Sequence, residues 1–548
     1  MASLGLVFHR LARGSLAVSA AAWLVAARPL AAQEGGVDVR GEVFVGSEVE
    51  RYLRVLQVAG AAPLYPWTVR GLSTRELDRA LPTDSLHSWA RRYRLEGDTA
   101  RGIRVRPVRP RAQLFFNSAF PHGGADGPVW VGRGVTTAVE GGVQVEAGPL
   151  SLTLAPIVFV AQNAGFDLHP NALEGPLRFA DGLYATVIDV PQRFGDGAYA
   201  RVDPGQSTLR LDARGVALGI STANQQWGPA SDNPILLGNH AGGFPHVFAG
   251  TSRPANVWLG TLHGRMVWGA LQQTEYSPQV GEKRRFLAGA AATFSPRGAP
   301  GLELGAARVF ELPWPGGGLG GDELLLPFQG LFKGGLSRSI REDTDSVGVN
   351  QLASVFFRWV HPRARVELWG EFARDDHNYD VRDFVLQPDH ESAYMLGGRK
   401  VWRSGTRIRA LRAEVLNARV THLAQVRGQA PFYIHASVRQ GHTQRGQVLG
   451  SPSAFAGLGS VVGFDQYVPG GRWGVAWTQT VRDGPAPAPR TSGTGDGADV
   501  THALQAERLF SRGKFEITAG GAAVYQLNRN FEDDAFNLSL VLKVSRGF

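Results

Sequence analysis

Hydrophobic and polar residues alternate with a period of two at the C-terminus of the chain. The apolar set comprises Phe536, Leu538, Leu540, Leu542, Val544 and Phe548, with Arg546 as its one exception. The intervening positions are mainly polar, and a period of two places successive side chains on opposite faces of a β-strand. A strand over 536–548 exceeds the usual soluble length of about five or six residues and suits a tilted membrane strand.

The same alternation recurs upstream over 209–214, 363–373 and 472–482, where charged residues occupy the second face. In a wide membrane barrel such charges line the lumen while the apolar face meets lipid. Strands can span a membrane only in a closed barrel, because an open sheet edge leaves backbone groups without partners. The pattern therefore predicts an all-β fold, a transmembrane antiparallel β-barrel; a soluble β-rich exported protein is the alternative.

Long and short connections alternate between the predicted strands, as they do in barrels with long outer loops and short periplasmic turns. This alternation predicts that the connection Arg374–Ser392 is extracellular. Residues 104–548 are long enough for about 18 strands, with a margin of about two. We assign this range to an outer-membrane barrel.

The first 32 residues predict a signal peptide. Arg10 and Arg13 precede an apolar run over 16–27, and Ala31 and Ala32 offer small residues for cleavage. A run of this length is shorter than the roughly 20 residues of a membrane-spanning helix. A retained helical anchor is the alternative.

Residues 33–103 predict a small helical region on the periplasmic side, beneath or inside the barrel mouth. Apolar residues recur at helical spacing over 43–59 and 73–81, and Ser73 with Glu76 is typical of a capping box at a helix start. Residues 84–95 predict another short helix.

Composition narrows the possible chemistry. The chain has no cysteine, which excludes disulfides and thiolate chemistry. Its net charge is +9, or +6 once the three arginines of residues 1–32 are removed, and the excess is dispersed. No basic block supports nucleic-acid binding. The common catalytic and nucleotide-binding motifs are missing, so we expect no enzyme, catalytic residue, metal or cofactor.

Two segments carry candidate binding chemistry. Residues 226–241 combine Trp227, turn-forming residues, Asn239 and His240. Aromatic faces, amides and carboxylates are groups that bind sugars, but the same segment suits a loop folded inward to block the lumen. In the predicted outer loop, Arg374-Asp375-Asp376-His377 and Asp389-His390-Glu391 suit solvated loop charges, glycan binding, calcium binding or, least of all, catalysis.

The segment from Trp227 to Pro245 resembles a motif of the Wzi capsule-assembly proteins, with Trp-Gly-Pro, a leucine-rich step, Asn-x-Ala and Phe-Pro. Residues 370–376 and 394–397 resemble the second motif of that family. The resemblance implies an outer-membrane barrel of about 18 strands with periplasmic helices and occluding loops. It also implies a lectin that holds or organises capsular polysaccharide at the cell surface.

We therefore predict an outer-membrane protein that binds capsular or other surface polysaccharide and helps to attach or assemble the capsule. Its other partners would be outer-membrane lipid and the barrel-assembly machinery, through the strand that ends in Phe548. The predicted polysaccharide contacts are Trp227 by stacking, Arg374 by pairing with uronic acids, and Asn239, His240, Asp375 and Asp376 by hydrogen bonding. The alternatives are a porin or saccharide channel and, further off, an outer-membrane hydrolase.

Overall fold

The computed structural model describes residues 37–38, 41–82, 86–89, 93–94, 102–277, 279, 283–329, 348–375, 381–421, 428–484 and 498–547. The predicted signal peptide, Asp376 and Phe548 lie outside these ranges. No described helix is long and apolar enough to cross a membrane.

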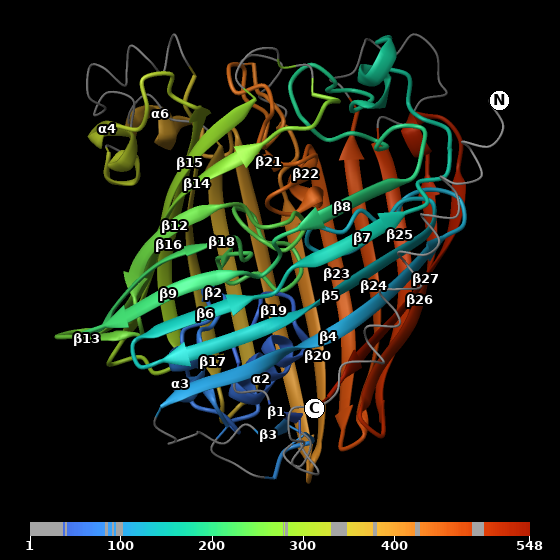
Figure 1. Ribbon diagram of the computed structural model, residues 1–548. Coiled ribbons are helices and arrows are strands. Elements are labelled where there is room, and N and C mark those ends of the chain that lie inside the picture. Colours follow the sequence, from blue (N-terminus) through green and yellow to red (C-terminus); the bar gives the residue numbers. More distant parts are fainter. Residues whose placement is uncertain are drawn as a thin grey trace, which may run out of the picture.

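An antiparallel sheet closed on itself forms the wall (Figure 1). Its strands are β4 (Ile103–Asn117), β5 (Gly134–Ala147), β6 (Leu150–Leu154), β7 (Ile157–Ala161), β8 (Tyr199–Asp203), β9 (Thr208–Ala213), β10 (Val216–Ser221), β12 (His246–Thr251), β13 (Ala255–Val257), β14 (Gly260–Gln272), β15 (Arg284–Pro296), β16 (Leu302–Pro313), β17 (Asn350–His361), β18 (Val366–Asp375), β19 (Ser392–Ser404), β20 (Arg407–Asn417), β23 (Gly457–Val468), β24 (Gly471–Asp483), β25 (Ala498–Arg512), β26 (Phe515–Leu527) and β27 (Ala535–Arg546).

Three passes across the wall are interrupted: β6 with β7, β8 with β9, and β12 with β13 each make one pass. Counted this way, the described residues form a barrel of 18 strands. β27 pairs with β4, with Leu542 opposite Leu114, and this pairing closes the ring. The predicted fold, an antiparallel barrel of about 18 strands, is confirmed.

The alternation along each strand separates an apolar outer face from a polar inner face. On β27, Leu538 and Leu540 are exposed on the outside, whereas Asn537 is fully buried on the inside. On β24, Trp473 is exposed outside and Arg472 is buried inside. The outer face is therefore the one that meets lipid.

The two ends of the barrel differ. Long connections, including those that carry α4 (Gly321–Leu324), α6 (Val381–Leu386) and the 3-10 helices η1 (Gly175–Phe179) and η2 (Leu326–Phe328), lie at one end, which we call the loop end (Figure 1). Short turns such as 214–215, 405–406 and 513–514 lie at the opposite, turn end. We take the loop end as extracellular.

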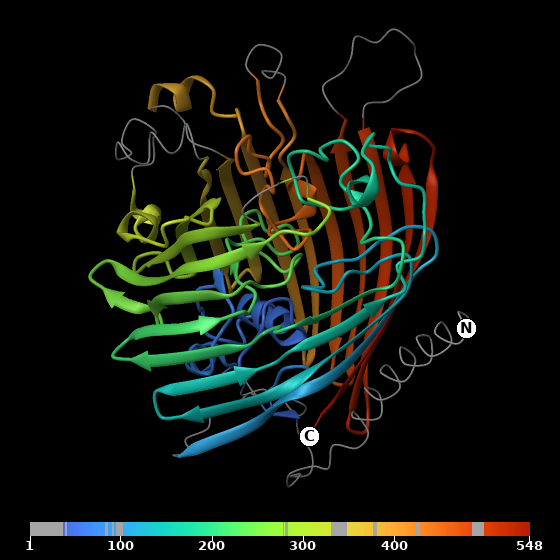
Figure 2. The same cartoon turned by 45° about the horizontal axis from the view of Figure 1, so that its top comes forward.

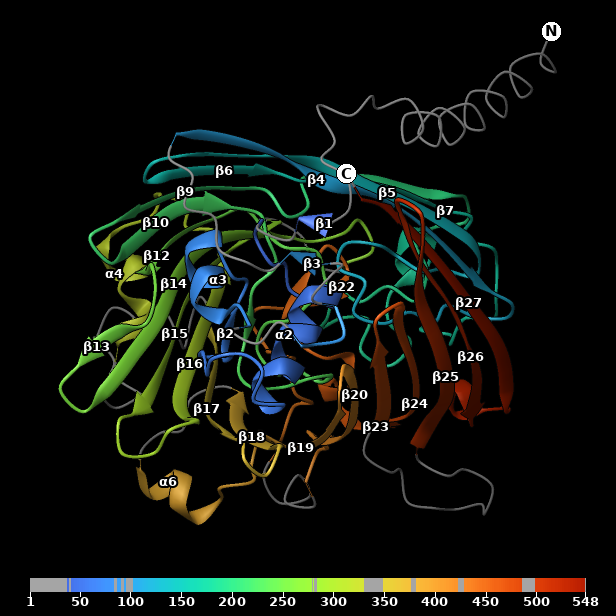
Figure 3. The ribbon, with the colours of Figure 1, turned by 90° about the horizontal axis from the view of Figure 1, so that it is seen from below.

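The N-terminal segment, residues 41–82, lies inside the ring of strands near the turn end (Figure 3). It contains α2 (Glu48–Val58), β2 (Val69–Arg70) and α3 (Thr74–Ala80). The predicted capping box is present, because Ser73 accepts from the amide of Glu76 and the Glu76 carboxylate accepts from the amide of Ser73. The start of α3 is thus encoded locally.

The helix predicted over 84–95 is wrong. The described residues there form a turn at Leu86–Trp89 and the short strand β3 (Tyr93–Arg94), which pairs with β1 (Val37–Asp38). Trp89 donates its indole N–H to the carbonyl of Gly471 at 3.2 Å, and Ser88 donates to the carbonyl of Thr406. These two side-chain bonds attach the segment to the wall at its turn end.

Candidate functional site

A long connection of the wall folds into the lumen. β10 and β12 have only six residues each, and residues 222–245 between them, which we call the motif loop, enter the barrel (Figure 2). Its strand β11 (Gln226–Trp227) pairs with β2 of the N-terminal segment. Two segments distant in sequence thus meet inside the ring.

The first turn of the motif loop requires a glycine at the position after Trp227. Gly228 has a φ of +90°, and a Cβ there would collide with the carboxylate of Glu371 on β18. Only glycine combines this backbone conformation with such a close approach. Trp227 itself is fully buried.

A wall carboxylate holds the next turn of the motif loop. Glu414 accepts hydrogen bonds from the successive amides of Ser231 (2.6 Å), Asp232 (3.0 Å) and Asn233 (2.5 Å). It also accepts from the indole N–H of Trp369 at 2.9 Å. Charge-assisted bonds of this kind are stronger than neutral ones, so Glu414 fixes this turn against the wall.

A second wall carboxylate joins three elements. Glu367 pairs with Arg54 of α2 (2.8 Å), Arg358 of β17 (2.6 Å) and Arg399 of β19 (2.7 Å), all of them buried. Arg54 also donates to the carbonyl of Ala230 at 3.1 Å. Arg54 therefore connects α2, the wall and the motif loop.

The described residues of a second connection, 418–421 and 428–456, also fold inward and contact the motif loop. His442 contacts the carboxylate of Glu311 at 2.7 Å and the carbonyl of Leu236 at 2.6 Å. The amide of Tyr433 donates to Asp375 at 2.5 Å. The two loops are thereby bound to the wall and to each other.

The wall between β8 and β14 is incomplete toward the loop end, because β10 and β12 stop early. The hairpin of β21 (Thr443–Gln444) and β22 (Gln447–Val448) lies in this interval (Figure 1). Arg445 at its turn donates its amide to the carbonyl of Gln272 on β14 at 2.8 Å and pairs with Asp203 on β8 at 3.2 Å. A loop hairpin, which forms a sheet of its own, therefore fills this interval and bonds to both flanking strands.

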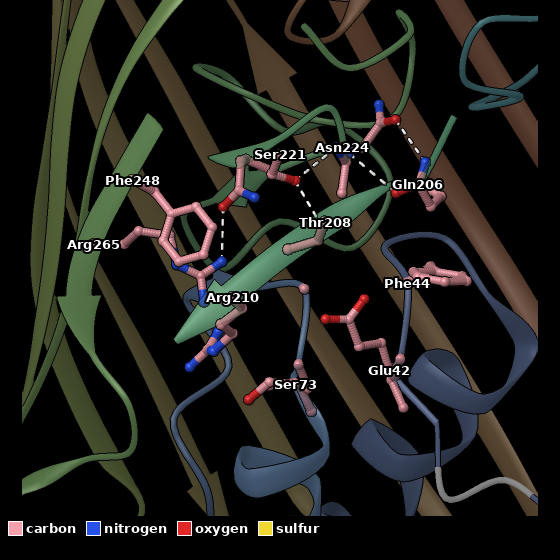
Figure 4. Close-up of a pocket in the computed structure, with 15 residues that line it drawn as sticks. Glu42, Phe44, Ser73, Gln206, Thr208, Arg210, Ser221, Asn224, Phe248 and Arg265 are labelled. Atoms are coloured by element: carbon pink, nitrogen blue, oxygen red, sulfur yellow. Dashed lines mark hydrogen bonds between the residues drawn. The ribbon is translucent and has the colours of Figure 1, made fainter. Parts of the chain in front are cut away.

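A pocket lies between the N-terminal segment and the inner wall (Figure 4). Glu42 and Phe44 line it from one side, Arg210 and Arg265 from the wall, and Asn224 from the motif loop. Burial raises the pKa of Glu42 to about 7, although the charge of Arg210 opposes the shift. The aromatic, amide and charged groups that line this pocket are of types that bind sugars. The pocket lies toward the turn end, however, and not at the loop end.

Trp227, Asn239 and His240, which the sequence singled out together, differ in accessibility. Trp227 has no exposed ring face, whereas Asn239 and His240 are partly exposed. Asn239 donates to the carbonyl of Ala125 at 2.7 Å. Burial lowers the pKa of His240 to about 4, so this imidazole is neutral at physiological pH.

Arg374 and Asp375 lie in β18, so the prediction that they begin the outer loop is wrong. As successive strand residues they point to opposite faces. Asp375 faces the lumen and Tyr433, whereas Arg374 lies on the outer face and donates to the carbonyl of Pro388 at 3.0 Å. They are not brought together into one site, and Asp376 lies outside the described residues.

Sequence reasoning missed a partly exposed cluster at the loop end. Arg482 pairs with Asp181 at 2.7 Å and lies over the ring of Tyr184, 5.8 Å from its centroid. Arg419 pairs with Asp483 at 2.7 Å, but Asp483 directly follows Arg482 in β24, so this second pair lies on the opposite face of the wall from Arg482. Arg482 stood on the charged face of a predicted strand, but Asp181 and Tyr184 lie in a connection without periodicity, so no sequence signal identified them.

Among the described residues, no group of three or more His, Asp or Glu side chains is placed to hold a metal ion. The apolar outer face, the charged inner face and the closed antiparallel ring define an outer-membrane β-barrel, here with segments folded into its lumen.

The sequence profile of the family named capsule assembly protein Wzi matches residues 131–468, more than half of the chain. The chain belongs to this family. A search of curated protein sequences finds no match.

Among solved structures, the barrel is similar to Wzi of Escherichia coli, with 14% identity, a TM-score of 0.59 and coverage of 93% of this chain and 99% of that chain. OccK3 (OpdO) of Pseudomonas aeruginosa follows, with 12% identity, a TM-score of 0.39 and coverage of 81% and 95%. A BenF-like porin of Pseudomonas fluorescens has 9% identity, a TM-score of 0.41 and coverage of 81% and 99%.

Proposed function

We propose that this barrel binds surface polysaccharide at its loop end and helps to attach or assemble a capsule there, without catalysis. The Escherichia coli Wzi is described as an outer-membrane protein involved in group 1 capsule assembly and as a carbohydrate-binding β-barrel. Membership of the same family supports a related role for this chain.

The filled lumen is the observation that supports a binding protein and not a conducting channel. Inner-wall residues such as Arg285, Glu311 and Glu367 are fully buried beneath the inward segments. Charged residues that line an open channel would instead face water. The barrel thus serves as a rigid frame for the loops above it.

The partly exposed cluster at the loop end offers suitable chemistry for an acidic glycan. The ring of Tyr184 can stack on sugar C–H groups, and the guanidinium group of Arg482 can pair with uronic acid carboxylates. Arg482 already contacts Asp181, which fixes its geometry. We add Tyr184 and Arg482 to the proposed contacts.

Asn239 and His240 remain proposed contacts, because both are partly exposed. Trp227 and Asp375 are buried, so we assign them an indirect role through the position of the motif loop and of residues 428–456. Arg374 lies outside the wall, where it cannot reach a glycan bound in the lumen. β27 carries the alternation that we propose the barrel-assembly machinery recognises.

The test measures retention of surface polysaccharide in cells that lack the protein and are complemented with variants. We expect Y184A and R482A to release polysaccharide into the medium while barrel insertion stays normal. R407A, an exposed arginine at a turn of the opposite end, is the matched control. Retention equal to wild type in both variants would contradict the assignment.

Planar-bilayer recordings separate binding from transport. A filled lumen predicts little single-channel current. A steady conductance like that of an open barrel of about 18 strands would favour a porin instead.

A further inference from the structure

Arg308 and Arg374 lie on the outer, lipid-facing side of the wall, toward its loop end. Arg308 on β16 alternates with the inward Val309 and Glu311, and Arg374 on β18 alternates with the inward Asp375. An arginine is costly at such a position unless other groups shield it from lipid. Both are nevertheless buried.

Each arginine is covered by a loop that folds outward over the wall. Residues 314–329, which we call the first flap, supply the carbonyl of Gln329, which accepts from Arg308 at 2.5 Å. Residues 381–391, the second flap, supply the carbonyls of Gln387 and Pro388, which accept from Arg374 at 3.2 and 3.0 Å. Figure 1 shows α4 and α6 of these flaps at the loop end, and Figure 3 shows α6 beyond the ring.

The first flap is packed against the wall. Leu326 joins a buried cluster with Phe286 and Phe310, both on the outer face of their strands. The indole of Trp268, on the outer face of β14, donates to the carbonyl of Leu324 at 2.9 Å. The flap therefore has a defined inner side that replaces lipid over part of the wall.

The other side of both flaps exposes large apolar side chains. In the first flap these are Leu319, Leu324, Leu325 and Phe328; in the second they are Val381, Val385 and Leu386. A water-facing surface of a loop normally carries few such residues, and a cluster of them indicates a contact.

We propose that both flaps are immersed in the outer leaflet of the membrane, with these side chains among the lipid acyl chains. The argument for lipid is continuity, because the exposed apolar belt of the wall, including Val355, Phe357 and Leu396, continues along the same strands from the flaps toward the turn end. The flaps widen the barrel within the leaflet on the β14–β19 side. Apolar side chains held at a membrane surface by a packed backbone are typical of interfacial anchors. This inference is independent of the proposed polysaccharide binding.

The chain contains no cysteine, so single nitroxide labels can be placed without background. We compare L325C and V385C with L396C on the lipid belt and E174C on an exposed connection of the loop end. Each variant is reconstituted in vesicles of phosphatidylethanolamine and phosphatidylglycerol, and correct folding is checked by heat-dependent gel mobility. Collision rates with oxygen and with a neutral nickel complex then report depth.

If the flaps are immersed, the ratio of the oxygen collision rate to the nickel collision rate at labelled positions 325 and 385 should equal the ratio at position 396. It should exceed the ratio at position 174 by about tenfold, because the polar nickel complex is excluded from hydrocarbon. Ratios equal to that at 174 would overturn the proposal. Spin–spin broadening that disappears on dilution with unlabelled protein would also overturn it, since the flaps would then contact a second copy of the chain.

Discussion

Arg54 offers a direct test of how the N-terminal segment is held inside the barrel. The substitution R54A removes its ion pair with Glu367 and its hydrogen bonds to the carbonyls of Pro229 and Ala230, but leaves Glu367 paired with two wall arginines. Because Glu367 keeps two partners, the cost is that of the lost hydrogen bonds of a charged group, about 1.5–3 kcal/mol for one such bond. At about 1.4 kcal/mol per tenfold, the open population of α2 should rise by at least about 10- to 100-fold.

Amide hydrogen exchange of α2 measures this population, because exchange by local opening scales with the opening constant. R51A on the same helix is the matched control: its pairs with Glu48 and Glu507 involve a side chain that is 39% exposed. An exposed pair contributes at most about 1 kcal/mol, or about fivefold in exchange. Equal exchange in R54A and R51A would refute the view that buried pairing to the wall holds the segment.

Two further predictions concern titration and the motif loop. Because burial raises the pKa of Glu42 from 4.5 to about 7, the docked segment binds this proton more tightly than the free segment does. Docking of the N-terminal segment should therefore weaken as pH rises from about 5 through 7. The measurement is the exchange rate of the Val43 amide, which should rise with pH after correction for the intrinsic exchange rate. E42Q should remove this pH dependence, and an unchanged dependence in E42Q would contradict the prediction. E414Q removes the charge that binds the amides of residues 231–233. The loss of one charged hydrogen bond costs about 1.5–3 kcal/mol, so hydrogen exchange of these amides should become about 10- to 100-fold faster. Full protection of these amides in E414Q would show that other contacts hold the loop.

The wall could be predicted from sequence because its signal is local and repeated. Each strand carries its own alternation, and a single case such as 536–548 already distinguishes the lipid face from the lumen face. The capping box at Ser73 and Glu76 is local in the same sense, and it too was predictable. The helix expected over 84–95 is not formed by the described residues, because tertiary contacts outweigh local propensity there: the side chains of Ser88 and Trp89 bond to residues more than 300 positions away in the chain.

The site was harder to predict because its contacts join distant residues. Nothing near Glu414 indicates that it binds amides at 231–233, and nothing near Glu367 indicates an arginine at position 54. Arg374 and Asp375 look like one charged cluster in sequence, yet the strand separates them onto opposite faces of the wall. Adjacency in sequence misleads where the backbone alternates.

The arginine-rich inner face has a consequence for how the loop end can respond to a ligand. Its charges are mostly paired with carboxylates and backbone carbonyls of the inward segments, and the removal of such groups from water is costly unless every partner is in place. One closed arrangement is therefore favoured over partly opened ones, because an intermediate would leave a guanidinium or a carboxylate without its partner. Arg54 bonds both Glu367 and the motif loop, and His442 bonds both Glu311 and that loop. A displacement at the loop end would consequently be resisted at the N-terminal segment, which makes the barrel and its inward segments one mechanical unit.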